Sequence, residues 1–448
     1  MKSPSARLAI HPNHQRIARG ALWMTFFVLI AKLCVAAKEI TIAWRYGVSG
    51  IVDAYQLAYT ITTWLPMILG GVLSSVLVPL LVSHARSSDR DRSLLAELNG
   101  WSVAACAAVL TVTLLAGPEL ALAMSSHLSA SVQKLAEALV FSLSPLAFLM
   151  LLGNYLAVRL QALGKYSYSL WEATPAIGII LFVTFFHRSG PSALPLVWGT
   201  LVGTLAGIAC LLFALRESPF GIGGIALSRR SPAWRPVARA FWIVTAGQLV
   251  MGATIPIDQA FAAQLGGGAV ATLGYANRLI GLGTSLGTLI IARALLPVLS
   301  EVADADHHQL GYSHTARWAV LMLALGGIGA ATAWMFAPWA VTILFQRGAF
   351  TSADSAVVTH VLRWGLPQLP LYCSGIVFVQ WLAAQRQYKL MFWNTLIATI
   401  AKLGFNILLI GPFGLAGITL ASALMYGVAL LTLWIFSARL NRGTDEQA

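Results

Sequence analysis

Long apolar stretches recur along the whole chain, and short polar segments separate them. Each stretch is long enough for the roughly 20 residues that a helix needs to cross the hydrocarbon core of a bilayer. The pattern therefore predicts an all-α integral membrane protein with about twelve transmembrane helices. The predicted spans are 21–43, 54–83, 98–124, 136–160, 169–187, 193–215, 238–263, 271–299, 316–345, 355–384, 390–411 and 414–438.

Composition agrees with lipid as the main solvent of this chain. Of its 448 residues, 58% are hydrophobic and only 10% are charged, and the mean hydropathy is +0.76. A soluble protein has about 25% charged residues. The first span could instead be a signal peptide, because "LCVAAKE" resembles a cleavage site, but Lys32 within it and eleven further spans favour a membrane helix.

The net charge of +13 could indicate binding of nucleic acid, but its distribution argues against that partner. An even number of spans places both termini on the same side. The segments on that side carry 19 Lys and Arg, and the opposite segments carry four. The positive-inside rule therefore predicts that both termini are cytoplasmic, and it explains the basic composition as topology.

The sequence repeats itself with an offset of about 220 residues, as a duplicated unit would. Residues 43–61, "AWRYGVSGIVDAYQLAYTI", parallel residues 262–280, "AAQLGGGAVATLGYANRLI", and three further echoes follow in the same order. Six spans per unit insert the same way round, which predicts two pseudo-symmetric six-helix bundles around a central cavity. The predicted parts are a cytoplasmic segment 1–20, a bundle 21–215, a cytoplasmic linker 216–237, a bundle 238–438 and a cytoplasmic tail 439–448.

The connector 216–237 is basic and rich in Gly and Pro, and we expect a linker that could include a short interfacial helix. No other loop is long enough for an extramembrane catalytic domain, so the sequence predicts a transporter and not an enzyme. The four cysteines all fall within predicted spans without a C-x-x-C pair, which favours packing over a metal or disulfide role.

Charged residues inside the spans are the candidate functional groups. A charge at the bilayer centre costs about 2.5–3.5 kcal/mol even on insertion scales, so each must face a wet cavity, a partner or a ligand. The cations within spans are Lys32, Lys38, Arg278, Arg293, Arg363 and Lys402, and the acids are Glu39, Asp258 and, near a span edge, Glu172.

Two cationic helix faces predict a cavity that binds an anion. Lys32 and Glu39 are seven residues apart, which places them on one helix face about 10 Å apart, and Lys38 widens this polar stripe. Arg278 and Arg293 lie on the repeat-related helix. The structural alternatives are that Glu39 merely neutralises a lysine, and that Arg293 and Arg363 extend to the interface.

Asp258 and Lys402 are the remaining opposite charges, and both fall in the C-terminal half. They could pair as a structural lock, or as a coupling element that separates when a cation binds. The sequence leaves both interpretations open.

Four segments carry a resemblance to a known family. They are "AKLCVAAKEITIAWRYGVSGIVDAY", "GYANRL", "ALLPVLS" and "LFQRGAFTSADS". The chain resembles the MurJ/MviN lipid II flippases of the multidrug/oligosaccharidyl-lipid/polysaccharide (MOP) exporter superfamily. The resemblance implies a substrate-binding cavity whose residues here are Lys32, Lys38, Glu39, Asp53, Asn277 and Arg278.

That resemblance further implies alternating access in the bacterial inner membrane. The implied partner is an undecaprenyl-pyrophosphate-linked glycan amid membrane lipids, carried by a monomer without cofactor or metal. Membrane potential, Na⁺ or H⁺ would reset the cycle.

Several departures from the family keep other functions open. Residues 64–75, "WLPMILGGVLSS", lack the usual basic pair, Asn277 replaces an acid, and Lys32 and Lys38 replace arginines that could bind phosphate with two parallel hydrogen bonds. The sequence also ends before two helices usual in the family. The alternatives are an exporter of another surface-polysaccharide repeat unit, a MATE-like cation-coupled drug antiporter, a membrane glycan polymerase or ligase, and a scaffold without transport.

Overall fold

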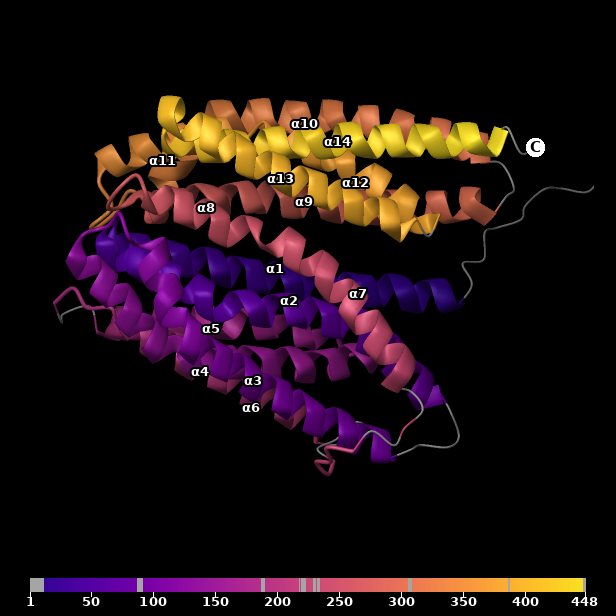
Figure 1. Cartoon of the computed structure of the whole chain (residues 1–448), viewed down its shortest axis with the longest axis horizontal. Coiled ribbons are helices and arrows are strands. Elements are labelled where there is room, and N and C mark those ends of the chain that lie inside the picture. Colours follow the sequence, from indigo (N-terminus) through magenta and orange to yellow (C-terminus); the bar gives the residue numbers. More distant parts are fainter. Residues whose placement is uncertain are drawn as a thin grey trace, which may run out of the picture. The chain divides into compact units, whose positions relative to one another are not determined.

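The computed structural model describes residues 12–86, 92–186, 190–216, 218, 223–228, 231, 234–304, 308–385 and 387–445 (Figure 1). The described residues form fourteen α-helices and one 3-10 helix, and no strand among them, which confirms the predicted all-α fold. The helices are α1 (Pro12–Tyr46), α2 (Gly50–Arg86), α3 (Arg92–Met124), α4 (Ala130–Ala162), η1 (Tyr166–Ala173), α5 (Thr174–Phe185), α6 (Leu194–Leu215), α7 (Trp234–Gly252), α8 (Thr254–Ala263), α9 (Ala269–Asp304), α10 (His308–Phe345), α11 (Ser352–Gly365), α12 (Gln368–Ala384), α13 (Tyr388–Phe413) and α14 (Leu415–Asp445).

The helices account for all twelve predicted spans. Among the described residues, ten helical stretches are long and apolar enough to cross a membrane. The other two predicted spans correspond to α1 and α9, which carry Lys32 and Arg278. Three spans are built from two helices each, namely η1 with α5, α7 with α8, and α11 with α12.

The break between α7 and α8 follows from a proline. Pro256 has no N–H, so the Gly252 carbonyl loses its donor four residues on. The indole Nε1 of Trp64 donates to this carbonyl instead, at 2.8 Å. A tertiary contact thus satisfies a backbone group that hydrocarbon could not.

The chain consists of two compact units, each assembled from segments that are not consecutive in sequence. Unit 1 contains Met1–Thr41, Leu65–Thr113 and Ser142–Val244, and unit 2 contains Ile42–Trp64, Leu114–Phe141 and Thr245–Ala448. Several helices of the first repeat therefore contribute one part to each unit. This division differs from the predicted boundary between repeats, which stays a prediction.

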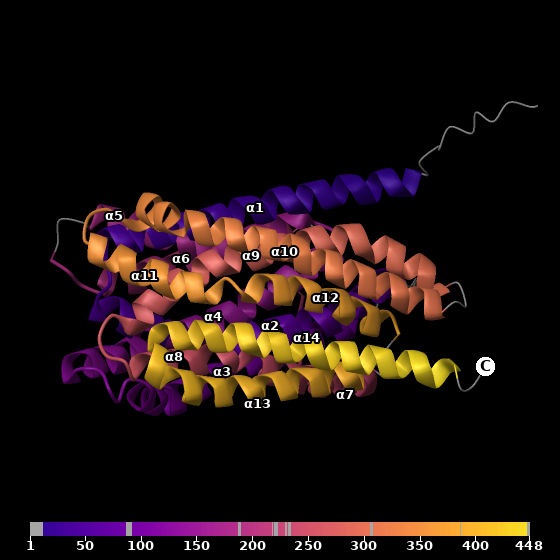
Figure 2. The same cartoon turned by 90° about the horizontal axis from the view of Figure 1, so that it is seen from above.

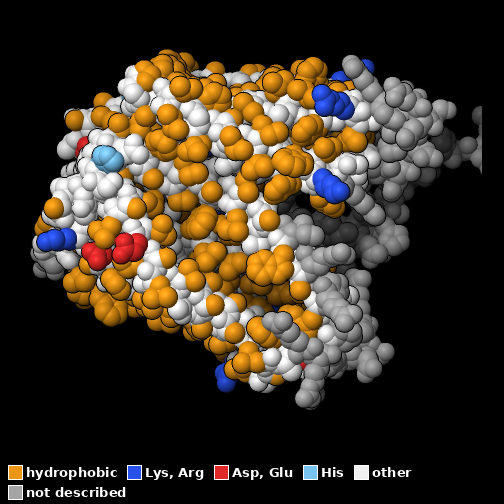
Figure 3. Space-filling model, in the orientation of Figure 1, with side chains coloured by type: hydrophobic (Ala, Val, Ile, Leu, Met, Phe, Trp, Pro, Cys, Tyr) orange, Lys and Arg blue, Asp and Glu red, His pale blue; other side chains and the backbone are white. Residues whose placement is uncertain are grey.

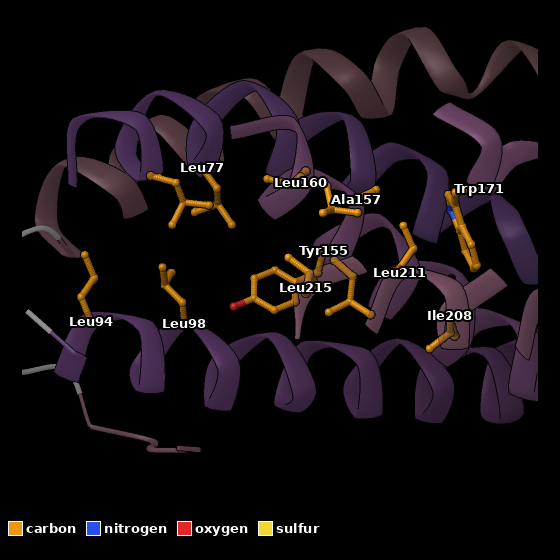
Figure 4. Packing of buried hydrophobic residues seen from close by; sticks show 13 residues of the cluster. Leu77, Leu94, Leu98, Tyr155, Ala157, Leu160, Trp171, Ile208, Leu211 and Leu215 are labelled. Carbon is orange, nitrogen blue, oxygen red and sulfur yellow. The ribbon is translucent and has the colours of Figure 1, made fainter. Parts of the chain in front are cut away.

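The core of unit 1 lies between α2, α3, α4, η1 and α6. Figure 4 shows Leu94 and Leu98, one turn apart on α3, pointing toward Leu77 of α2. Nearby, α5 and α6 approach so closely that only glycine fits at position 178, where a Cβ would lie 2.1 Å from the Gly199 carbonyl oxygen. Such glycine contacts are typical of helices packed in a membrane.

In unit 2, α12 packs against both α10 and α14, and the three helices run side by side (Figure 1 and Figure 2). Val377, Phe378 and Trp381 of α12 fill the buried space between them. Hydrophobic side chains predominate on the face of the molecule shown in Figure 3, as a lipid-facing surface requires.

The loop after α10 interlocks with the end of α1. The Ala349 N–H donates to the Trp44 carbonyl at 2.9 Å, and Phe350 is buried with its ring 5.4 Å from that of Tyr275. Gly348 has φ +61°, and a Cβ there would lie 2.2 Å from the Trp44 carbonyl oxygen. The motif "LFQRGAFTSADS" is thus a packed junction within unit 2.

Helix starts repeat along the chain with the predicted offset. Gly50 of α2 and Ala269 of α9, Ala130 of α4 and Ser352 of α11, and the first residues of α6 and α14 are each separated by about 220 residues. The two halves therefore follow the same order of helices, as the sequence echoes predicted.

We expect Gly348→Val to lower the free energy of unfolding by about 1–3 kcal/mol, because a branched side chain is strained at positive φ and its Cβ meets the Trp44 carbonyl. Thermal unfolding in detergent would measure the effect. Gly329→Val on α10 is the control, since nothing lies within 4 Å of a Cβ there. Equal shifts in both variants would contradict the assigned packing.

Candidate functional site

Lys32 of α1 pairs with Glu172 of the 3-10 helix η1, and both belong to unit 1. The ammonium nitrogen lies 3.1 Å from Glu172 Oε2, and the two side chains are 43% and 62% exposed. Exposed ion pairs contribute only about 0–1 kcal/mol, so this partner can be exchanged at low cost. From the sequence, Glu172 was only an acid near a span edge, and nothing in its spacing assigned it to Lys32.

Lys38 and Glu39, adjacent on α1, form a second ion pair. Lys38 Nζ lies 2.8 Å from Glu39 Oε1, and the side chains are only 10% and 3% exposed. Removing one member of a buried pair leaves an uncompensated charge, at about 3–5 kcal/mol. This geometry agrees with the structural alternative given above, in which Glu39 neutralises a lysine and does not bind cargo.

Asp53, in the first turn of α2, is fully buried in unit 2. Its carboxylate accepts hydrogen bonds from the backbone N–H groups of Gly268 and Ala271, the latter at 2.7 Å. These amides lie at the start of α9, where a helix presents unsatisfied donors and a partial positive charge. Asp53 therefore caps α9 from another helix.

Asn277 and Arg278 lie next to each other on α9 and are both exposed. They lie about two helical turns after the capped start of α9, since an α-helix has 3.6 residues per turn. Asp53 thus fixes the helix that presents the Arg278 guanidinium.

Asp258 and Lys402 do pair, at the centre of a buried polar cluster in unit 2. Lys402 Nζ lies 2.7 Å from Asp258 Oδ2 and 2.9 Å from Ser422 Oγ, while Asn406 Nδ2 donates to Asp258 Oδ1 at 3.2 Å. Lys402 and Asn406 share the inward face of α13 because they are four residues apart. Asn406 Oδ1 has no hydrogen-bond partner among the described residues.

Arg293 and Arg363 are the arginines that could instead extend to the membrane interface. Arg363 contacts Trp334 of α10. Its guanidinium carbon lies 4.3 Å from the centre of the Trp334 ring, and Nε donates to the Trp334 carbonyl at 3.1 Å. The side chain of Arg293 lies outside the described residues.

The predicted site residues fall in two different units. Lys32, Lys38 and Glu39 belong to unit 1, and the others, Asp53, Asp258, Asn277, Arg278 and Lys402, belong to unit 2. The central cavity that would join them stays a prediction. Among the described residues, no group of three or more His, Cys, Asp or Glu could hold a metal ion.

Helices of this length and hydropathy indicate a multi-pass membrane protein, and comparison with solved structures shows which proteins share its fold. The inward-closed structure of the lipid II flippase MurJ superposes with a TM-score of 0.76 at 18% identity, covering 93% of this chain and 87% of that one. An inward-facing multidrug resistance MATE transporter of the MOP superfamily also gives 0.76, at 16% identity over 96% and 99% of the two chains. The chain therefore shares the fold of these two transporters.

The family model described as lipid II flippase MurJ matches residues 42–448. The chain belongs to this family, as its motifs predicted. The MurJ of Burkholderia cenocepacia is 26% identical over 446 residues, covering 95% of this chain and 84% of that protein. A probable MurJ of Haemophilus influenzae is 22% identical, covering 88% and 81% of the two chains.

We expect Lys402→Met to destabilise the protein by about 3–5 kcal/mol, because the Asp258 carboxylate would remain buried without its cation. The double variant Lys402→Met with Asp258→Leu should recover most of this loss. Thermal unfolding of the three proteins checks the expectation.

If the pair is a lock, the double variant should also transport at the parental rate. A stable double variant that no longer transports would instead identify Asp258 and Lys402 as a coupling element. The two interpretations left open by the sequence are thereby separated.

Proposed function

We propose that the chain is a flippase of the bacterial inner membrane for an undecaprenyl-pyrophosphate-linked glycan, with lipid II as the first candidate. Membership of the MurJ family supports this proposal, as do relatives that bear that name. Both termini would be cytoplasmic, and the two repeats would alternate in exposing the cargo to either side.

The observation that carries the proposal is the half-exposed pair of Lys32 and Glu172. Most exposed neighbours of Lys32 on α1, such as Leu29 and Leu33, are apolar, so its ammonium is a partly exposed cation among apolar side chains. A phosphate group can take the place of the carboxylate because the exposed pair is weak. The buried pairs Lys38–Glu39 and Lys402–Asp258 offer no such exchange.

Glu172 would act as a resident counter-ion that alternates with the cargo. An arriving diphosphate displaces the carboxylate and accepts hydrogen bonds from Lys32 Nζ. After release, Glu172 returns, so the ammonium never remains without an anion at membrane depth. Arg278 would provide a further cationic contact, and its planar guanidinium can donate two parallel hydrogen bonds to a phosphate.

A cation-coupled drug antiporter is less well supported by the described carboxylates. Such a protein binds cations on accessible acids, whereas Glu39, Asp53 and Asp258 are buried and engaged by an ammonium or by backbone N–H groups. Glu172 is the exposed acid of the predicted set, and a lysine holds it. The membrane potential is our proposed driving force.

Neutralising the exposed cations tests the binding role. We expect Lys32→Gln and Arg278→Gln each to weaken binding of undecaprenyl pyrophosphate by about tenfold or more, since each removes a charge-assisted hydrogen bond. Lys134→Gln, an exposed lysine at the start of α4, is the matched control. Binding to purified protein in detergent is the measurement, and unchanged affinity in both variants would refute the site.

Removing the counter-ion should have the opposite effect on affinity. We expect Glu172→Gln to strengthen binding of undecaprenyl pyrophosphate about two- to fivefold, the equivalent of one exposed ion pair, and to slow transport because release is no longer assisted. Glu119→Gln, at an exposed position of α3, is the control. Weaker binding in Glu172→Gln would remove the exchange mechanism while leaving the Lys32 site intact.

Rescue of a strain depleted of its own lipid II flippase decides the glycan. Growth that depends on Lys32 and Arg278 supports lipid II as the cargo. If the protein binds undecaprenyl pyrophosphate through Lys32 yet does not rescue growth, the cargo is the lipid-linked repeat unit of another surface polysaccharide.

A further inference from the structure

The connector between the two repeats is bound to the start of α3. Its described residues 223–228 are not helical, so the short interfacial helix considered from the sequence is not formed there. Every second residue from Gly224 to Ser228 bonds to α3, through the carbonyls of Gly224 and Ser228 and the N–H of Ala226, as an extended segment laid along a helix would place them. The hydrogen bonds are Ala226 N–H to the Ala96 carbonyl at 2.9 Å, Asn99 Nδ2 to the Gly224 carbonyl at 3.2 Å and Trp101 Nε1 to the Ser228 carbonyl at 3.2 Å.

Gly100 is the residue of α3 that lets the connector come this close. A Cβ at this position would lie 2.1 Å from the carbonyl oxygen of Ala226, where no side chain fits. Any larger residue would therefore lift the connector from the helix.

Glu97 is the polar centre of the contact and is fully buried. Its carboxylate accepts hydrogen bonds from Ser228 Oγ at 2.7 Å, from Trp234 Nε1 at 2.7 Å and from the Ser231 N–H at 3.4 Å. Trp234 is the first residue of α7, and its ring also meets that of Trp101 edge-on, with 6.3 Å between centroids. One carboxylate thus joins the connector and the start of α7 to α3.

The same stretch of α3 is tied to α4. Asn99 Oδ1 accepts from Tyr155 OH at 2.7 Å and from a terminal guanidinium nitrogen of Arg159 at 3.0 Å. All these residues belong to unit 1, as does α7 up to Val244. From Thr245 onward, α7 belongs to unit 2.

We propose that Glu97, Gly100 and the connector form a clasp that stays closed during transport and makes the first part of α7 a fixed extension of unit 1. Glu97 is then a positioning residue, which acts through α7 and not on the cargo. Movement between the units would be taken up in α7 after Val244, before or at the break that precedes α8. This inference concerns the transport cycle and does not depend on which lipid-linked glycan is carried.

A disulfide tests whether the clasp is closed. A Cβ at Gly224 would lie 3.9 Å from Ala96 Cβ, within the 3.5–4.5 Å typical of disulfides. We expect Ala96→Cys with Gly224→Cys to crosslink efficiently on mild oxidation, in a transport-competent background whose native cysteines, Cys34, Cys106, Cys210 and Cys373, are replaced by alanine. The oxidised protein should transport as fast as the reduced protein, and absence of the crosslink or loss of transport on oxidation would overturn the proposal.

Two variants open the clasp in independent ways. Glu97→Gln replaces one accepting carboxylate oxygen with an NH₂ group, which cannot accept from Ser228, Ser231 or Trp234. Gly100→Leu excludes the connector by size. In either background the crosslinking rate of the introduced cysteines should fall to about a tenth. Glu119→Gln on the same helix and Gly329→Leu on α10 are the matched controls and should leave the rate unchanged.

Transport and binding then separate positioning from general damage. Glu97→Gln and Gly100→Leu should lose transport while undecaprenyl pyrophosphate binding that depends on Lys32 is kept. Parental crosslinking in both variants, or normal transport with the clasp open, would contradict the inference. If the parent itself does not rescue growth, the proposed cargo is wrong, but the crosslinking rates still decide whether the clasp exists.

Discussion

The structure depends on one constraint: a charge removed from water must be compensated within the protein, by an opposite charge or by hydrogen bonds. Lys32, Lys38 and Lys402 each have a carboxylate within about 3 Å, so the protein itself compensates these charges in this conformation. The pairs differ in exposure, and exposure decides their role. Lys38 and Lys402 are enclosed with their partners, whereas Lys32 and Glu172 remain open to exchange.

The same constraint applies to backbone groups. Asp53 satisfies amides at the start of α9, and Trp64 satisfies the carbonyl that Pro256 leaves without a donor. Both contacts join helices that are about 190 to 220 residues apart in sequence. Unit 2 is thus held together by polar groups that would be costly to leave unpaired in lipid, and α9 presents Arg278 from a fixed start.

Hydropathy was sufficient for the number and class of the spans, because crossing a bilayer requires long apolar helices whatever their packing. It could not predict that three spans consist of two helices, because hydropathy is averaged over a whole span. The break before α8 follows from Pro256, and the distant Trp64 satisfies the carbonyl that it leaves without a donor. Side-chain roles were harder still. The cavity role that the resemblance gives Asp53 stays a prediction, while its capping of α9 depends on a residue 218 positions away in sequence. Glu172 was not paired with Lys32 because η1 brings it there from 140 residues away.

The contacts of the connector between the two repeats could not be predicted from its sequence either. Its Gly and Pro content indicated a linker that could include a short interfacial helix. Glycine also permits close backbone approach, and here Gly100 of α3 leaves the space that the connector occupies. A free linker would let α7 begin anywhere within its reach, whereas the buried Glu97 carboxylate, which accepts from Ser228, Ser231 and Trp234, fixes the Trp234 side chain at one position. If that position is kept through the cycle, the connector transmits movement between the two units, because α7 is one of the helices that start in unit 1 and continue into unit 2.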